Sequence, residues 1–308
     1  MKPILFFLSL LWLSCQPKAN TSSVSSTVSL TVLGIAQDAG APHIGCLKSC
    51  CKETTMKHKV VSLGVVDPIE SKSWLFEATP DITAQLKALQ KFSHFSTQVP
   101  DAIILTHAHI GHYTGLMYLG KEALGAKKVP VLCMPRLKSF LENNGPWSQL
   151  VNDSNIVARQ LKANRDTALS NLVSLTTILV PHRDEYSETA GYIIQGPQKS
   201  ALFIPDIDKW DKWNQDIREI IREVDYAFID GTFYNGNELP HRNMQKIPHP
   251  FVVESMNRLR ELPNTQKNKV YFIHLNHTNP LLNTSSEEAK ALREAGYHIA
   301  QEGDQFIL

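Results

Sequence analysis

The chain has 308 residues, of which 43% are hydrophobic and 20% charged, a composition typical of a globular protein. Its net charge is +1, and no run of Lys and Arg is longer than a pair, which excludes the basic patch that nucleic-acid binding requires. We therefore expect a small-molecule substrate and no nucleic-acid partner. The length suffices for one large domain or two small ones.

The first 15 residues predict an export signal. An apolar run over residues 4–13 is too short to cross a bilayer as a helix, but it fits the core of a signal peptide. Cys15 follows the small Ser14 and resembles the lipobox cysteine of bacterial lipoproteins. Residues 16–27 are polar and predict a flexible tether. We expect a protein anchored by lipid on Cys15 to a bacterial membrane facing the periplasm; a soluble periplasmic protein is the alternative.

A β-branched run over residues 28–35 predicts the first strand, and a loop containing Gly and Pro follows it. This loop carries Cys46, Cys50 and Cys51. Three thiols within six residues favour a metal site that takes one more ligand from elsewhere in the chain. An exported protein can instead use cysteines in disulfides, and Cys133 would be the fourth cysteine of the mature domain. The residues alone leave both alternatives open.

Two more strands are predicted over residues 60–66 and 73–77, followed by a helix over residues 82–91. Glu77 ends the second of these strands, and Asp81 precedes the helix. The family resemblance described below implies that one of these carboxylates orients a metal-bound imidazole through the second nitrogen of the ring. Asp81 can equally be the N-cap of the helix.

Three histidines follow an apolar run over residues 102–105. His107, His109 and His112 lie within six residues, and the first two lie on the same side of an extended chain. Imidazole is the commonest metal ligand, and three imidazoles at the end of a strand suit Zn²⁺ or Fe²⁺. The segment therefore predicts a metal site.

Strands and helices alternate through the rest of the chain, which predicts an α/β fold. Further strands are expected over 129–134, 172–180, 200–208 and 225–230, and helices over 113–124, 135–144, 209–223, 251–262 and 285–296. Residues 145–170 predict an irregular polar segment. Cys133 lies in an apolar run and is expected in the core. Because no internal boundary is visible, we expect one domain over residues 28–308.

The sequence THAHIGH at residues 106–112 resembles the H-x-H-x-D-H signature of the metallo-β-lactamase superfamily, with Gly111 in place of the aspartate. One branch is similar over further segments, namely the pyrroloquinoline quinone biosynthesis protein B and its phosphodiesterase-like hydrolase relatives. These segments are ATPDI (78–82), VDYAFIDGTFY (224–234) and VYFIHLNHTNPLL (270–282). The resemblance implies an αββα sandwich, in which two sheets pack together and helices cover both outer faces.

The resemblance also implies further metal ligands. His182 matches the third imidazole ligand of the first metal, and Asp206 matches the carboxylate that bridges two metals, although Asp206 can also cap the following helix. One late histidine holds the second metal, which we assign to His274. The first metal site would then comprise His107, His109, His182 and Asp206, and the second His112, Asp206 and His274. We expect Asp206 and His112 to take part in catalysis.

Relatives in this branch hold a structural zinc with a cysteine cluster and a late histidine. The resemblance therefore implies a structural site made by Cys46, Cys50, Cys51 and His277. The relatives space their cysteines as C-x-C-x₂-C, whereas this chain has C-x₃-C-C, so which thiols bind stays open. The assignments of His274 and His277 can also be exchanged.

The glycine at position 111 removes a carboxylate that, in hydrolases of this superfamily, ligates the second metal and helps hold the attacking water. We therefore expect one or two Zn²⁺ ions at the active site, the second weakly bound, besides the structural one. A Gly111→Asp substitution is expected to tighten the second site, unless Gly111 has a positive φ.

Three functions fit these residues. The favoured one is a zinc-dependent hydrolase of an ester- or phosphodiester-like small molecule, in which Zn²⁺ lowers the pKa of its water to about 7 and Asp206 orients the hydroxide. The branch also implies an iron-dependent oxygenase in quinone cofactor biosynthesis, with Fe²⁺ in place of zinc, but an export signal fits poorly with a cytoplasmic pathway. The third is a lipid-anchored binding protein without catalysis. The oligomeric state does not follow from the sequence.

Overall fold

The structure is a computed structural model that describes residues 27–53, 57–94 and 96–308. The expected signal peptide, Cys15 and residues 16–26 of the tether lie outside the described residues. Within the described part of the chain, no helix is long and apolar enough to cross a membrane.

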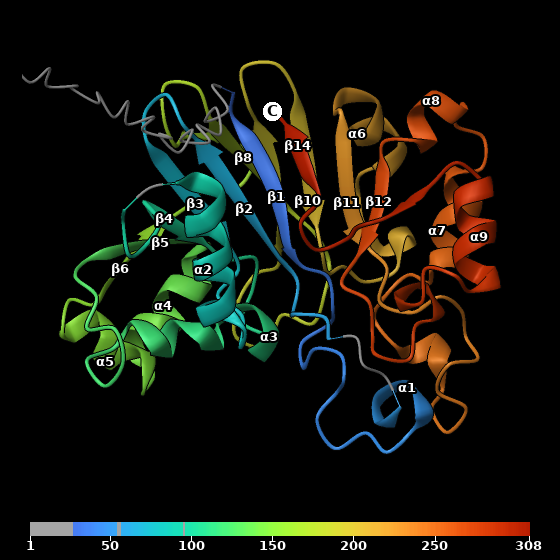
Figure 1. The fold of residues 1–308 in the computed structure, drawn as a ribbon, viewed down its shortest axis with the longest axis horizontal. Coiled ribbons are helices and arrows are strands. Elements are labelled where there is room, and N and C mark those ends of the chain that lie inside the picture. Colours follow the sequence, from blue (N-terminus) through green and yellow to red (C-terminus); the bar gives the residue numbers. More distant parts are fainter. Residues whose placement is uncertain (1–26, 54–56, 95) are drawn as a thin grey trace, which may run out of the picture.

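Two seven-stranded sheets form the centre of the described molecule (Figure 1). The first sheet has the strand order β14-β1-β2-β3-β4-β5-β6. Its strands are β1 (Ser29–Gly34), β2 (Ser62–Asp67), β3 (Lys72–Phe76), β4 (Ala102–Ile104), β5 (Val129–Cys133), β6 (Ile156–Gln160) and β14 (Gln305–Ile307). Strands β14 to β3 pair antiparallel, and strands β3 to β6 pair parallel.

The second sheet repeats this pattern, with the order β13-β12-β11-β10-β9-β8-β7. Its strands are β7 (Asp166–Ala168), β8 (Ser174–Leu179), β9 (Ala190–Gln195), β10 (Ser200–Ile204), β11 (Tyr226–Asp230), β12 (Val270–Ile273) and β13 (His298–Ile299). Strands β7 to β10 pair antiparallel, and β10 to β13 pair parallel.

Strand direction decides which loops meet. In the first sheet β1, β3 and β4 run the same way, because β2 is antiparallel to both β1 and β3. In the second sheet β8, β10, β11 and β12 likewise share one direction. Within each sheet, the segments that follow these strands therefore emerge at a single edge.

Side chains from both sheets share one hydrophobic cluster. Phe76 of the first sheet packs edge-on against Tyr192 and Phe203 of the second, with ring centroids 5.9 and 6.0 Å apart. All five residues of β10 are buried, as expected for a strand covered on both faces. Apolar contact between the facing sheets is thus the main source of stability away from the loops.

Helices cover the outer faces (Figure 1). The helices α2 (Ile82–Ser93), η1 (Thr114–Leu119), α4 (Pro135–Asn143) and α5 (Trp147–Asn152) contribute to the apolar cluster on the outer face of the first sheet. On the side of the second sheet lie α6 (Ile217–Glu223), α7 (Val252–Leu259), α8 (Asn264–Lys267) and α9 (Glu287–Glu294). Shorter elements in the loops are α1 (Ser49–Lys52), α3 (Ile110–Tyr113), η2 (Trp210–Lys212), η3 (Met244–Lys246) and η4 (Pro280–Leu282). The predicted αββα sandwich is confirmed.

Three expected elements differ in the structure. The segment expected to be irregular contains α5, β6 and β7. Its strands escape detection because β6 is short and lies at the sheet edge, with Val157 exposed between buried Ile156 and Ala158. The helix expected from residue 113 begins earlier, as α3, and the one expected over 209–223 is divided into η2 and α6.

Candidate metal centre

Six of the predicted ligands come from the loops that follow like-directed strands. His107 and His109 follow β4, and His112 lies in α3 directly after them. The other three follow strands of the second sheet: His182 follows β8, Asp206 follows β10 and His274 follows β12. The directions of the strands therefore bring ligands of the first and second sheets, 70 to 167 positions apart in the sequence, to neighbouring positions, as their distances show.

The first group comprises His107, His109, His182 and Asp206, whose candidate ligand atoms all lie within 4.8 Å of one another. His107 Nε2 is 3.3 Å from Asp206 Oδ2 and 2.8 Å from His109 Nδ1. His182 Nε2 is 3.2 Å from the other oxygen of Asp206, Oδ1. The group offers three imidazole nitrogens and a carboxylate, a donor set that suits Zn²⁺.

A second group lies on the other side of Asp206. His112 Nε2 is 3.8 Å from Asp206 Oδ2, and the rings of His112 and His274 are 5.3 Å apart. His112, His274 and Asp38 again have their ligand atoms within 4.8 Å of one another. Asp206 thus lies between two clusters of imidazoles, where one carboxylate can serve two cations.

Two buried threonines determine which nitrogen of two of the imidazoles faces the site. Thr106 donates its hydroxyl proton to Glu77 Oε1 at 2.6 Å, so His107 Nδ1, at 2.9 Å, must donate to Thr106 Oγ1. Thr232 donates to Asp230 Oδ1 at 2.7 Å and accepts from His274 Nδ1 at 2.9 Å in the same way. In both rings Nε2 therefore keeps its lone pair for a metal.

Glu77 is the outer carboxylate that contacts Thr106 and His112 beside the ligands of the first sheet. It is fully buried, and its Oε1 lies 3.2 Å from His112 Nδ1. Asp81, the other candidate for this role, instead accepts a hydrogen bond from the Val60 backbone N–H at 2.9 Å. Glu77 and His274 both have positive φ, 72° and 63°, a backbone strain that is concentrated at functional sites.

Burial and charge act in opposite directions on these groups. Burial raises the pKa of Asp206, but His182 and His249 outweigh it and hold the pKa well below its usual range. Burial lowers the pKa of His112, but Glu77 and Asp38 raise it to about 10. Burial lowers the pKa of His274 to about 4.

Several buried ligand atoms have no hydrogen-bond partner among the described residues. They are His112 Nε2, His182 Nε2, His274 Nε2, Asp206 Oδ1 and Asp38 Oδ1. Unpaired buried polar atoms are costly, and so many in one place are uncommon without an ion or a water that satisfies them. The donor set therefore fits divalent cations.

His249 is a further member of the site that was not predicted from the sequence. This residue follows η3 and is almost fully buried, with Nδ1 2.8 Å from Asp230 Oδ2 and 3.1 Å from Asp206 Oδ1. Burial lowers the pKa of His249, but Asp230 and Asp206 raise it to about 10. Together with His274, these residues form a third group of closely spaced candidate ligands. A histidine between two prolines in a long loop gave no strand or helix pattern from which to place it.

The expected effect of a Gly111→Asp substitution is wrong. The second group does not lack a carboxylate, because Asp38, in the loop after β1, places Oδ1 3.5 Å from His112 Nε2. A Cβ atom built on Gly111 would lie 2.2 Å from Asp38 Oδ1 and 2.5 Å from its Cα, so an aspartate at position 111 has no room. Backbone strain is not the obstacle, since Gly111 is not among the residues with positive φ.

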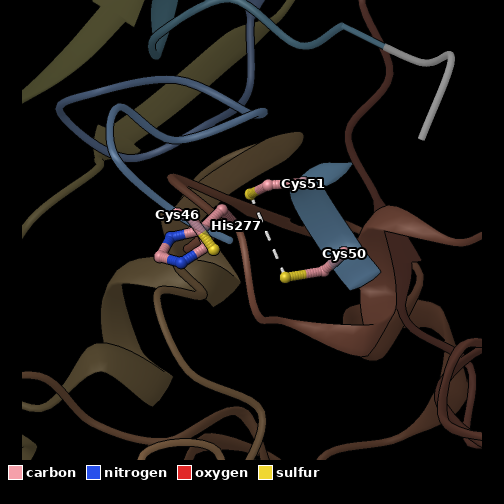
Figure 2. A group of neighbouring side chains, drawn as sticks. All are labelled: Cys46, Cys50, Cys51 and His277. Carbon is pink, nitrogen blue, oxygen red and sulfur yellow. Dashed lines mark hydrogen bonds between the residues drawn. The ribbon is translucent and has the colours of Figure 1, made fainter. Parts of the chain in front are cut away.

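The cysteine cluster of Cys46, Cys50, Cys51 and His277 is a separate group of candidate ligands (Figure 2). Ligand atoms of Cys46, Cys50, Cys51 and His277 all lie within 4.8 Å of one another, and the sulfurs of Cys50 and Cys51 are 4.0 Å apart. Tetrahedral zinc with Zn–S bonds of about 2.3 Å separates its sulfurs by about 3.8 Å. These thiols are free, and His277 Nδ1 has no hydrogen-bond partner among the described residues. The four side chains therefore fit a structural zinc, whereas Cys133 is buried in the core.

Comparison with known proteins identifies the family. Residues 73–275 match the β-lactamase superfamily domain. The chain is 25% identical to the coenzyme PQQ synthesis protein B of Methylococcus capsulatus, over 91% of this chain and 99% of that protein. It is 26% identical to the protein of the same name from Gluconobacter oxydans, with the same coverage.

Solved structures share the fold. Zinc-bound PqqB from Methylobacterium extorquens matches with a TM-score of 0.75 at 20% identity, over 91% of this chain and 100% of that one. A diphosphatase of the PhnP family matches with a TM-score of 0.66 at 22% identity, over 91% and 97% of the two chains. The chain belongs to the β-lactamase superfamily, has the metallo-β-lactamase fold, and is similar to PqqB proteins and to a diphosphatase of the PhnP family.

Proposed function

We propose that this protein is a zinc-dependent hydrolase that cleaves a phosphodiester- or ester-like bond in a small anionic molecule. The observation that carries the proposal is the position of Asp206 between two clusters of buried imidazoles. Cations held on either side of one carboxylate are close enough to act on the same bond, as in two-metal hydrolases with ions about 3.5–4 Å apart.

Divalent cations bound here would lower the pKa of a water molecule and polarise the bond under attack. The protein's own contribution is to hold and orient. Asp206 Oδ1 has no hydrogen-bond partner among the described residues and can accept a hydrogen bond from the attacking water. Glu77, Thr106 and Thr232 keep the imidazoles turned toward the site.

His249 is suited to donate a proton to the leaving oxygen. Its Nδ1 lies 2.8 Å from Asp230 Oδ2, and the neighbouring carboxylates of Asp230 and Asp206 raise the pKa of the ring, which favours the protonated form that a general acid needs. The acid and its orienting carboxylate resemble the base–orienter pairs of other hydrolytic sites. His249 therefore adds general acid catalysis to the hydrolase proposal.

The exposed rim offers one guanidinium to an anionic substrate, beside the Glu185 carboxylate, whose Oε2 lies 3.3 Å from His109 Nε2. Arg183 is exposed, and its Nη2 lies 3.5 Å from His109 Nε2 at the edge of the first group. A guanidinium at this edge can pair with a phosphate oxygen. This is why a phosphodiester is placed before a neutral ester or a lactam.

The test is hydrolysis by protein purified with Zn²⁺. Bis(p-nitrophenyl) phosphate should be cleaved faster than p-nitrophenyl phosphate, p-nitrophenyl acetate or a β-lactam. The His107→Ala and His182→Ala variants should keep the fold and lose both the metal of the first group and at least about 100-fold in kcat/KM. His241→Gln, an exposed histidine in the same loop as His249, is the control and should match the wild type. Turnover in either ligand variant at the wild-type rate would reject the proposal.

The similarity to coenzyme PQQ synthesis protein B over 91% of the chain supports a second candidate, an iron-dependent oxygenase. The same purified protein, loaded with Fe²⁺ in place of Zn²⁺, distinguishes the two. The resemblance to the quinone cofactor branch implies a tyrosine-derived substrate, and oxygen uptake with such a substrate, together with no hydrolysis of any ester by the zinc form, would favour the oxygenase.

A further inference from the structure

We propose that Asp38 is a ligand of the second metal and replaces the aspartate that the H-x-H-x-D-H signature would place at position 111. The carboxylate would then come from the loop after β1 instead of from α3. This inference rests on the proposed metal centre but is independent of which bond the protein cleaves.

The first observation is steric. The Cβ position of Gly111 lies 2.2 Å from Asp38 Oδ1 and 3.0 Å from Asp38 Cγ. Both separations are too short for non-bonded atoms, so the Asp38 carboxylate fills the space that a side chain at position 111 would enter. The same Cβ position lies 2.5 Å from the Asp38 Cα, so the backbone of the loop also leaves no room for a side chain at position 111.

The second observation is the position of Oδ1. It lies 3.5 Å from His112 Nε2, and neither atom has a hydrogen-bond partner among the described residues. Two ligands of one tetrahedral cation, with bonds of about 2.1 Å, stand about 3.4 Å apart. The separation is thus too long for a hydrogen bond of ordinary strength but suits a divalent cation bound by both atoms.

The third observation is that the Asp38 loop is fixed to the segment carrying His274. The Gln37 N–H donates to the Leu275 carbonyl at 2.9 Å, and the Leu275 N–H donates to the Ile35 carbonyl at 2.8 Å. The Asn276 side chain adds a hydrogen bond to Gln37 Oε1 at 2.9 Å. Asp38 and His274 each directly neighbour a residue of this backbone pairing, so their spacing is set before a metal binds.

The alternative is that Asp38 only neutralises a protonated His112. Glu77 already lies 3.2 Å from His112 Nδ1 and can fill that role from inside the protein. A second carboxylate on the opposite side of the ring, close to His274 as well as His112, is better explained as a ligand. With Asp206 shared, the second cation then has two imidazoles and two carboxylates, and it should bind about as tightly as the first.

Removing the Asp38 carboxylate tests the proposal. Asp38→Gly should weaken the second Zn²⁺ by more than about 100-fold, since losing even an outer-shell partner costs 10–100-fold. Gly111→Asp alone should also weaken it, because the new side chain collides with Asp38.

The measurement is Zn²⁺ content by mass spectrometry together with titration against a chelator, with the metal of the cysteine cluster counted separately. The Co²⁺ absorption spectrum adds a readout of ligand number at the second site. Circular dichroism establishes that each variant is folded. No substrate is needed, so a failed hydrolysis assay leaves this test intact.

Asp38→Asn covers the case in which Asp38→Gly does not fold, because it keeps the shape of the side chain and removes its charge. It should lose one active-site Zn²⁺. Asp81→Asn is the matched control, since Asp81 bonds to Val60 beside the same loop and belongs to no candidate metal group of the described residues. It should keep both ions. Two active-site ions bound with wild-type affinity in folded Asp38→Asn would overturn the proposal.

Discussion

Two threonine hydroxyl groups fix which nitrogen of His107 and of His274 is free to bind a metal. Thr106 and Thr232 each donate to a buried carboxylate and accept from a histidine, so each fixes a tautomer with Nε2 free. Such outer contacts orient metal ligands and raise their basicity. The two threonines therefore contribute to metal affinity without touching a metal.

Replacing Thr232 with valine keeps the volume and removes the hydroxyl. His274 Nδ1 would lose its acceptor and Asp230 Oδ1 a donor, which should cost about 1–3 kcal/mol of unfolding free energy. Zn²⁺ affinity at the second site should fall about 10–100-fold. Thermal unfolding and zinc titration measure the two effects.

Thr31→Val is the control for this substitution. The Thr31 hydroxyl is buried and has no hydrogen-bond partner among the described residues, so its loss should be neutral or stabilising. Equal effects of the two substitutions on zinc binding would mean that Thr232 does not orient His274.

The sequence located the ligands that lie next to strand ends but not Asp38 or His249. His107, His109 and His112 lie within six residues of one another, so their spacing can be recognised in the sequence alone. Asp38 is 73 positions from Gly111, and only the backbone pairing of its loop with Leu275 brings it to the site. The position of the Asp38 carboxylate beside Gly111 depends on three-dimensional packing, which the spacing of residues in one sequence does not reveal.

The expected strands were correct where an apolar run was long, as in β1, β2 and β8. They were missed where an edge strand buries only alternate residues, as in β6. The layer arrangement followed from the resemblance, because strands alternating with helices fit several α/β folds equally well.

The cysteine cluster and the second metal group depend on the same two segments. Asp38 and Cys46 lie in one loop, and His274 and His277 lie three residues apart after β12. A metal held by Cys46, Cys50, Cys51 and His277 would tie these two segments together at a second point. The cluster should therefore stabilise the geometry of the second group more than that of the first.

The Cys46→Ser variant should lose one zinc per chain and unfold at a lower temperature. Structural zinc is worth about 10–16 kcal/mol in small peptides, and the loss here should be much smaller because the sandwich core folds without it. The second active-site ion should weaken more than the first, because only the second group takes a ligand from this loop. Cys133→Ala removes a buried thiol outside the cluster and should leave the metal count unchanged. An unchanged zinc content in Cys46→Ser would exclude the structural site.

We propose that the whole protein is held at a membrane surface by lipid on Cys15, since Cys15 follows an apolar run and the small Ser14. Wild type should fractionate with membranes and be released by detergent. Cys15→Ala should lose the lipid and leave the membrane fraction. Recovery of the wild type in the soluble periplasm would reject the anchor.

At the scale of the whole molecule, the metal centre joins the two sheets. His107 and His109 follow a strand of the first sheet, whereas His182 and Asp206 follow strands of the second. Ions bound by both sets would link the sheets at one rim, while the apolar core that includes Phe76 and Phe203 holds them together elsewhere. Removing the ions should therefore leave a folded but less stable protein.

Protein stripped with a chelator should keep its far-ultraviolet circular dichroism and unfold at a lower temperature than the zinc form. A ligand that binds only the folded state adds about 2.7 kcal/mol when its free concentration is 100 times its Kd, so zinc should raise the melting temperature in proportion to the sites filled. In His182→Ala this rise should shrink, because the first site has lost a ligand on the second sheet. In Cys46→Ser, the part of the increase in melting temperature that comes from the active-site ions should persist. A melting temperature that zinc leaves unchanged in the stripped wild type would mean that the rim ligands do not bind the ion in the folded state.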